Sequence, residues 1–249
     1  MTNTDPDPAN FPFSTSGSER RVGVPIQEAV LTGRLLGAAG QLFRPGSGRT
    51  SWLLLEPKTG FGIPDALVIT ASESAVSAYV RRQLRLPSVS AARALTNTSA
   101  GTSGLSEPYA RSLRKELEEA GWDSRAIGKT ASIIHDSLAI EVKLRDARRA
   151  LQQINKFRVS ANRTALVMPE TAARHISTTT LGRLGAGLIV AEPESFRWHL
   201  TPQYQAIDLY RQLWLTELLV RGIETDQAYK LSAARKVRID SEIAATRLE

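Results

Sequence analysis

The chain has 249 residues, which is enough for one large domain or two small ones. Hydrophobic residues make up 42% of it, and no apolar run approaches the roughly 20 residues that span a bilayer. Cysteine is absent, which excludes disulfides and thiolate metal sites and leads us to expect a cytoplasmic protein. The net charge of +7 favours a polyanionic partner such as nucleic acid, although a compositional bias towards arginine would give the same charge.

The first part of the chain predicts a tail, one helix and two strands. Residues 1–22 are polar and rich in proline and serine, so we expect a disordered tail without a signal peptide. A helix is predicted from Pro25 to Gly40, because proline suits a first helical turn and glycine a helix end. Two apolar strands are predicted at 51–56 and 65–72, joined by a Gly/Pro-rich hairpin turn.

Residues 73–136 differ from their surroundings, with short helical segments around a Gly/Ser/Thr stretch. Strand character returns towards residue 143. The elements expected after it are a helix at 146–161, a strand at 163–169, a helix at 170–187, a strand at 188–192, a long helix at 202–222 and a final charged helix. Without residues 73–136, this order predicts an α/β fold with one sheet and helices on its faces.

Three charged residues lie at the ends of predicted strands. Asp65 follows Pro64 and opens the second strand, while Glu141 and Lys143 end the third. Side chains alternate along a strand, so Glu141 and Lys143 point to the same face. If the two strands are neighbours, Asp65 joins them, which places two carboxylates and one amine around one point.

Such a group suits phosphate chemistry assisted by a metal. Asp65 and Glu141, with the backbone carbonyl of Val142, are expected to hold Mg²⁺ or Mn²⁺. The ion lowers the pKa of a bound water, and Lys143 is expected to orient that water or stabilise the transition state. The alternative is a solvated strand end with a Glu141–Lys143 salt bridge. A second acid-x-lysine triplet, at residues 56–58, contains proline in a hairpin turn and lacks strand geometry.

The segments GIPDALVIT and LAIEVK, with the helix that follows, resemble the PD-(D/E)XK nuclease superfamily over residues 25–70 and 137–191. The resemblance implies a restriction-endonuclease-like mixed sheet flanked by helices and a metal-dependent DNA endonuclease. It also implies a further catalytic glutamate on the first helix, for which Glu28 is the match, unless Glu28 is only a first-turn acid favoured by the helix dipole. The family often has a glutamine on the helix after the E-x-K strand. Gln152 and Gln153 both qualify, and we favour Gln153 because it flanks the apolar face.

The inserted segment, residues 73–136, resembles a winged helix, with three helices and a β wing. LRKELEEAGW is similar to the end of a recognition helix, so Arg111, Arg114 and Lys115 are expected to contact DNA. The alternative is a solvated charged face, since Glu116, Glu118 and Glu119 lie on the same helix.

The expected organisation is a tail (1–22), a nuclease-like core (23–72 and 137–200), an inserted winged-helix-like subdomain (73–136) and C-terminal helices (201–249). The helix at 202–222 is apolar over a broad arc, so it is either core or the interface of a homodimer or partner subunit. We expect a DNA endonuclease that uses Mg²⁺ or Mn²⁺. Two alternatives stay open: a non-catalytic DNA-binding regulator, and a nuclease-like subunit of a larger defence or mobile-element complex.

Overall fold

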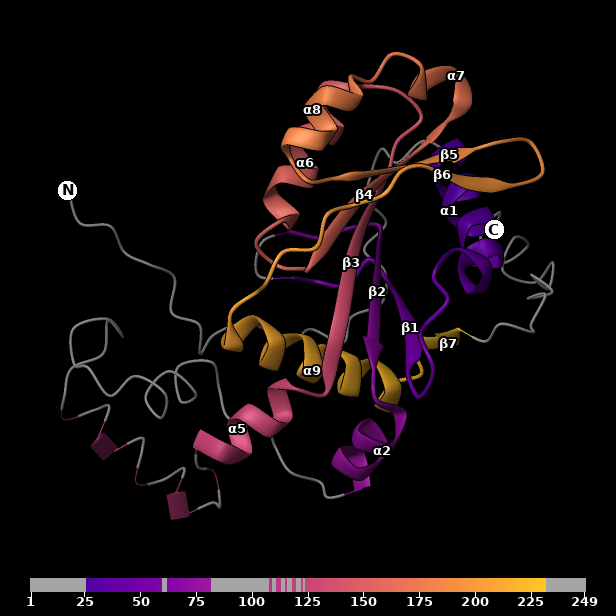
Figure 1. The fold of residues 1–249 in the computed structure, drawn as a ribbon. Coiled ribbons are helices and arrows are strands. Elements are labelled where there is room, and N and C mark those ends of the chain that lie inside the picture. The colour runs from indigo at the N-terminus through magenta and orange to yellow at the C-terminus, as the bar shows by residue number, and fades with distance from the viewer. Residues whose placement is uncertain are drawn as a thin grey trace.

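A seven-stranded mixed sheet organises the protein (Figure 1). The structure is a computed structural model, and it describes residues 26–59, 62–81 and 124–231 with positions 108, 111, 112, 115, 118, 119 and 122. The strand order is β6-β5-β4-β3-β2-β1-β7. The strands are β1 (Thr50–Leu55), β2 (Ala66–Ala71), β3 (Ile134–Val142), β4 (Arg163–Pro169), β5 (Gly187–Ala191), β6 (Phe196–Leu200) and β7 (Ala228–Leu231).

Strand direction changes across the sheet. β1 pairs antiparallel with both β2 and β7, and β2 pairs antiparallel with β3. β3, β4 and β5 are parallel, and β6 returns antiparallel along β5. The α/β class and the mixed sheet flanked by helices are therefore confirmed.

Two helices cover opposite faces of this sheet beside the end of β3. On one face, Leu31 and Leu35 of α1 (Ile26–Leu42) share an apolar cluster with Ile140 and Val142 of β3. On the other, Ile154 of α6 (Ala147–Phe157) joins a cluster under that helix. The β3 strand is thus buried on both sides, as its near-continuous apolar sequence predicts.

A third group of helices closes the other end of β3. α2 (Glu73–Arg81), α5 (Ser124–Ala131) and α9 (Leu209–Glu224) lie together there in Figure 1. Val76 of α2 and Leu215 of α9 belong to one cluster that also holds residues of β1, β2 and β3. None of the described helices is long and apolar enough to cross a membrane.

The two ends of residues 73–136 belong to the main body. α2 and α5 pack into the central cluster, and Ile134 and Asp136 pair with β2, so the sheet begins three residues inside the range predicted for the insert. Residues 82–107 lie outside the described part of the chain, and with them most of the predicted winged helix.

The C-terminal region differs from its prediction in two places. α9 begins at Leu209 rather than at Pro202, because the Asp208 side chain caps the helix by accepting a hydrogen bond from the Arg211 amide. Residues 228–231 form strand β7 instead of helix, since they complete the outer edge of β1. The predicted helix at 170–187 forms two short helices, α7 (Glu170–Ala173) and α8 (Thr178–Arg183).

Candidate active site

The candidate site lies where β3 ends beside the start of β2. Glu141 pairs in parallel register with Leu166, which lies in the apolar cluster under α6, so Glu141 faces the same side of the sheet. Ala66 pairs with Ile140 across the antiparallel β2–β3 ladder, which places the preceding residue, Asp65, next to Glu141. The strand register therefore brings the two predicted carboxylates together.

Lys143 lies at the centre of three carboxylates. Its Nζ is 2.8 Å from Glu141 Oε1, 3.7 Å from Glu28 Oε2 and 3.9 Å from Asp65 Oδ2. Four residues predicted from the sequence thus meet at one point, although they come from α1, the start of β2 and the end of β3. The Glu28 side chain turns towards this point from the first turn of α1.

Backbone groups fix two of these carboxylates. The Val142 amide donates a 2.7 Å hydrogen bond to Asp65 Oδ2, and the Leu144 amide donates a longer one, 3.4 Å, to Glu28 Oε1. The Val142 carbonyl, expected to be a metal ligand, accepts a 3.0 Å hydrogen bond from Lys143 Nζ. Sequence reasoning missed the two amide contacts, because side-chain patterns carry no information about which backbone amide a carboxylate meets.

The cluster is buried and holds three acidic groups to one basic group. Glu141 is 0% exposed and Lys143 is 8% exposed. Burial alone lowers the pKa of Lys143, but the hydrogen bond and charge of Glu141, with the charges of Asp65 and Glu28, outweigh burial and raise it. Lys143 is therefore a cation at neutral pH.

The carboxylate oxygens of the cluster are the type of ligand that a hard divalent cation prefers. Their present positions, however, do not form a metal-binding site. Within the residues that the structure describes, no three acidic or histidine side chains are placed to hold one ion. The Lys143 ammonium occupies the space between the carboxylates, with its Nζ 3.9 Å from Asp65 Oδ2 and 2.8 Å from Glu141 Oε1. A bound Mg²⁺ would need carboxylate oxygens at about 2.1 Å. Binding would require the ammonium to withdraw and the carboxylates to turn inwards.

The two candidate glutamines differ in environment. Gln152 is exposed, whereas the Oε1 of Gln153 is buried and has no hydrogen-bond partner. Gln153 lies on α6, which packs against β3 on the side that Glu141 faces. A buried amide oxygen without a hydrogen-bond partner destabilises the folded protein. Of the two glutamines, Gln153 is therefore the one whose side-chain oxygen could accept a hydrogen bond from a ligand.

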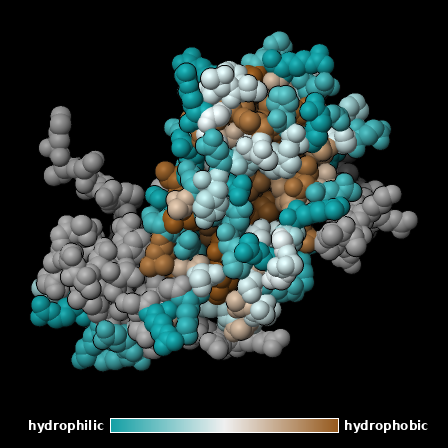
Figure 2. All heavy atoms as spheres, viewed as in Figure 1, coloured by the Kyte–Doolittle hydropathy of each residue, from teal (hydrophilic) through white to brown (hydrophobic). Residues whose placement is uncertain are grey.

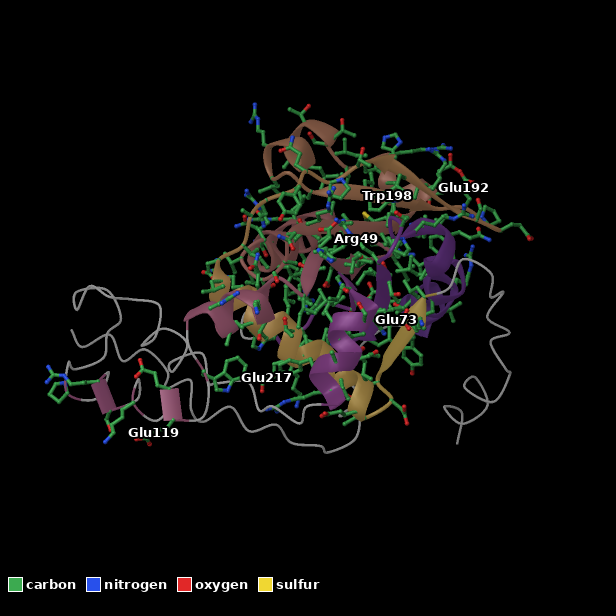
Figure 3. All side chains as sticks on the ribbon, turned by 60° about the horizontal axis from the view of Figure 1, so that its bottom comes forward. Arg49, Glu73, Glu119, Glu192, Trp198 and Glu217 are labelled. Carbon is green, nitrogen blue, oxygen red and sulfur yellow. The ribbon has the colours of Figure 1, made fainter. Side chains whose placement is uncertain are left out.

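The residues expected to contact DNA lie away from this cluster. Arg111 and Lys115 are exposed, and Arg114 lies outside the described residues. Lys115 pairs with Glu119 at 3.8 Å, and both side chains are largely in solvent. Figure 3 shows Glu119 well apart from Trp198 of the sheet. An exposed pair of this kind is worth little in stability, so Lys115 can exchange Glu119 for a phosphate at low cost.

Comparison with known proteins does not place the chain in a family. No family model matches it, and none of the curated proteins matches it. A search of solved structures finds a protein of unknown function from Silicibacter pomeroyi, with a TM-score of 0.39 and 11% sequence identity. The match covers 77% of this chain and 85% of that one.

Proposed function

We propose that the protein hydrolyses phosphodiester bonds in DNA at the Lys143 cluster, using Mg²⁺ or Mn²⁺. The observation that carries this proposal is the convergence of three carboxylates on one buried ammonium at the end of β3. Three carboxyl groups around one point offer the oxygen ligands that a divalent cation prefers. With α2 and α5 set aside, the order of helix, two strands, strand, helix and strand around the cluster is also the order expected of a PD-(D/E)XK core.

Each residue has a role that its contacts support. Asp65 and Glu141 would hold the ion, which when bound would activate water and offset charge on the phosphate. The Val142 amide orients the Asp65 carboxylate by hydrogen bonding to Oδ2. Lys143, protonated at neutral pH, would turn its ammonium from the carboxylates to the attacking water or to a phosphate oxygen.

Two further side chains complete the proposed site. Glu28 contributes a third carboxylate from α1, close enough to hold Lys143 in place. Gln153 offers its buried amide to a water or to the substrate. In this proposal, Arg111, Arg114 and Lys115 of the winged-helix-like segment add affinity for DNA, which the exposure of Arg111 and Lys115 supports.

A second candidate is a non-catalytic DNA-binding protein with a nuclease-like scaffold. The observation in its favour is the 2.8 Å pair between Lys143 and Glu141, which already gives the most buried carboxylate a counter-ion. Buried ion pairs also occur for structural reasons. This candidate predicts no hydrolysis at any concentration of metal ion.

Cleavage assays separate the two candidates. Purified protein is incubated with plasmid and linear DNA in Mn²⁺, in Mg²⁺ and in EDTA. We expect metal-dependent cutting by the wild type and none by Asp65→Asn. The matched control is Glu192→Gln, which removes a partly exposed acid that pairs with Arg197 on the β5–β6 hairpin, and it should cut normally. Equal cutting by wild type and Asp65→Asn would contradict the assigned site, and no cutting by the wild type would favour the scaffold.

A further inference from the structure

The exposed face of α6 is strongly basic. Cationic side chains stand in solvent on this helix and just before it: Arg145, Arg148, Arg149 and Lys156. The acid among them, Asp146, is occupied by capping the helix, since its side chain accepts a hydrogen bond from the Arg149 amide. Figure 2 shows hydrophilic residues over the end of the molecule where Figure 1 places α6, α7 and α8.

Several other arginines on the surface are paired, although Arg44, Arg49, Arg125 and Arg183 are exposed without an ion pair to a described carboxylate. Arg174, Arg197 and Arg221 each form an ion pair with a glutamate close in sequence. No described carboxylate forms an ion pair with any of the four cations of α6. A row of unpaired cations on one helix attracts a polyanion.

A groove runs beside this basic face, between α6 and the turn that precedes α8. Its volume is about 500 Å³, which is within the usual size range of small-molecule sites. Its floor is apolar and is formed by Leu151, Ile176 and Leu184. Three of its polar side chains come from one side of α6 at helical spacing: Arg148, Gln152 and Asn155. His175 and Ser177 also line it. The groove therefore combines a flat apolar surface, two amides and a guanidinium.

The groove is close to the candidate active site along the chain. Arg148 follows Lys143 by five residues, and five residues span at most about 18 Å even when fully extended. Phosphates along one strand of B-DNA are spaced about 3.4 Å apart along the helix axis. A strand that lies across the cluster would thus reach Arg148 within about five phosphates.

We propose that this groove seats one nucleotide of a single-stranded segment of the substrate, and that the basic face of α6 binds the neighbouring phosphates. The proposal rests on the proposed function, because it takes the substrate to be a nucleic acid. Leu151 and Ile176 contact the face of the base, and Gln152 and Asn155 hydrogen-bond to its edge. Arg148 and Arg149 bind phosphates.

A single strand fits this groove better than a duplex does. A paired base is held in its stack, and moving it into a side pocket requires that it be unpaired and unstacked. A base in a single strand is already free to turn its face to an apolar floor. The amides add hydrogen bonds that a simple polyanion such as heparin would not use.

The first test measures binding in EDTA, so that hydrolysis does not enter. Fluorescence anisotropy with a labelled oligonucleotide compares the wild type with Arg148→Gln/Arg149→Gln, a change to another good helix former. The control is Arg211→Gln/Arg221→Gln on α9, which removes the same charge from paired arginines. We expect roughly tenfold weaker binding for the α6 variant, and a salt-dependence slope smaller by up to about 1.4, at about 0.7 per phosphate contact on a single strand. Equal loss in the control variant would overturn the proposal.

The second test addresses the base. Oligonucleotides with a run of abasic positions should bind the wild type more weakly than the intact strand. Gln152→Ala/Asn155→Ala should bind the intact strand more weakly and should show a smaller difference between the two strands, with an unchanged salt slope. Tighter binding of duplex than of single strand by the wild type would contradict a seat for an unpaired base. Binding that depends on the groove, in a protein that cuts no DNA, would support the groove and refute the proposed hydrolysis.

Discussion

Replacing Lys143 with methionine tests whether the cluster is a buried charge network. The substitution keeps most of the side-chain volume and removes the cation that lies within 4 Å of three carboxylates. Glu141, which is 0% exposed, then lacks that counter-ion and must either stay ionised at a high cost or take up a proton. Removing one partner of a buried ion pair costs about 3–5 kcal/mol. For a chain of this size, that lowers the melting temperature by roughly 6–20 °C.

Thermal and urea unfolding in EDTA measure this cost. The matched control is Lys230→Met, since Lys230 pairs with Glu73 where both side chains are about half exposed, and we expect less than about 1 kcal/mol there. Glu141→Gln combined with Lys143→Met should be more stable than Lys143→Met alone, because the uncompensated charge is gone. If Lys143→Met costs no more than Lys230→Met, the cluster is not the buried charge network described above.

Three further predictions concern other parts of the account. Gly187→Ala should lower the free energy of unfolding by about 1–3 kcal/mol, because a Cβ there would lie 2.8 Å from Pro202 and 2.9 Å from the Leu200 carbonyl; normal stability in urea unfolding would be inconsistent with that packing. Gln153→Leu should leave stability unchanged or raised, since its buried Oε1 has no partner, yet should slow DNA cleavage; unaltered cleavage would remove Gln153 from the site. The raised pKa of Lys143 stabilises the folded protein, and this stabilisation is fully present below the ordinary pKa of 10.5 and is lost as pH rises through the raised pKa. Above pH 10.5 the wild type should therefore lose more stability than Lys143→Met. Parallel plots of stability against pH for the two proteins would argue against a charged Lys143.

The convergence of the site could be predicted because it depends on strand alternation. A spacing of two residues places Glu141 and Lys143 on one face of any strand, and the apolar residues before them predict that strand from sequence. Glu28 could be placed because Leu31 and Leu35 mark the inner face of its helix. The long separation in sequence between Asp65 and Glu141 did not prevent their pairing, since both neighbouring strands were evident.

Elements at the edges of the sheet could not be predicted in the same way. β6 alternates between half-buried and exposed residues, with Arg197 and His199 in solvent, so it lacks an apolar run. β7 has four residues, too few for a period-2 pattern to be clear. The start of α9 depends on tertiary contacts, because Gln205 is held extended by backbone hydrogen bonding to Asn162. Asp208 is a typical helix N-cap residue and could have marked the start of α9, but the prediction took Pro202 as the first residue of the helix.

Binding of a divalent cation by the cluster is the central requirement of the proposed function. Titration of the wild-type protein with Mn²⁺, followed by electron paramagnetic resonance and calorimetry, measures this directly and without any DNA. We predict one tightly bound ion per chain in the wild type, no such ion in Glu141→Gln, and retention of the ion in Lys143→Met, whose substitution removes the competing ammonium. Absence of binding by the wild type, or equal binding by Glu141→Gln, would contradict the assignment of Asp65, Glu141 and Lys143 as a metal-dependent active site.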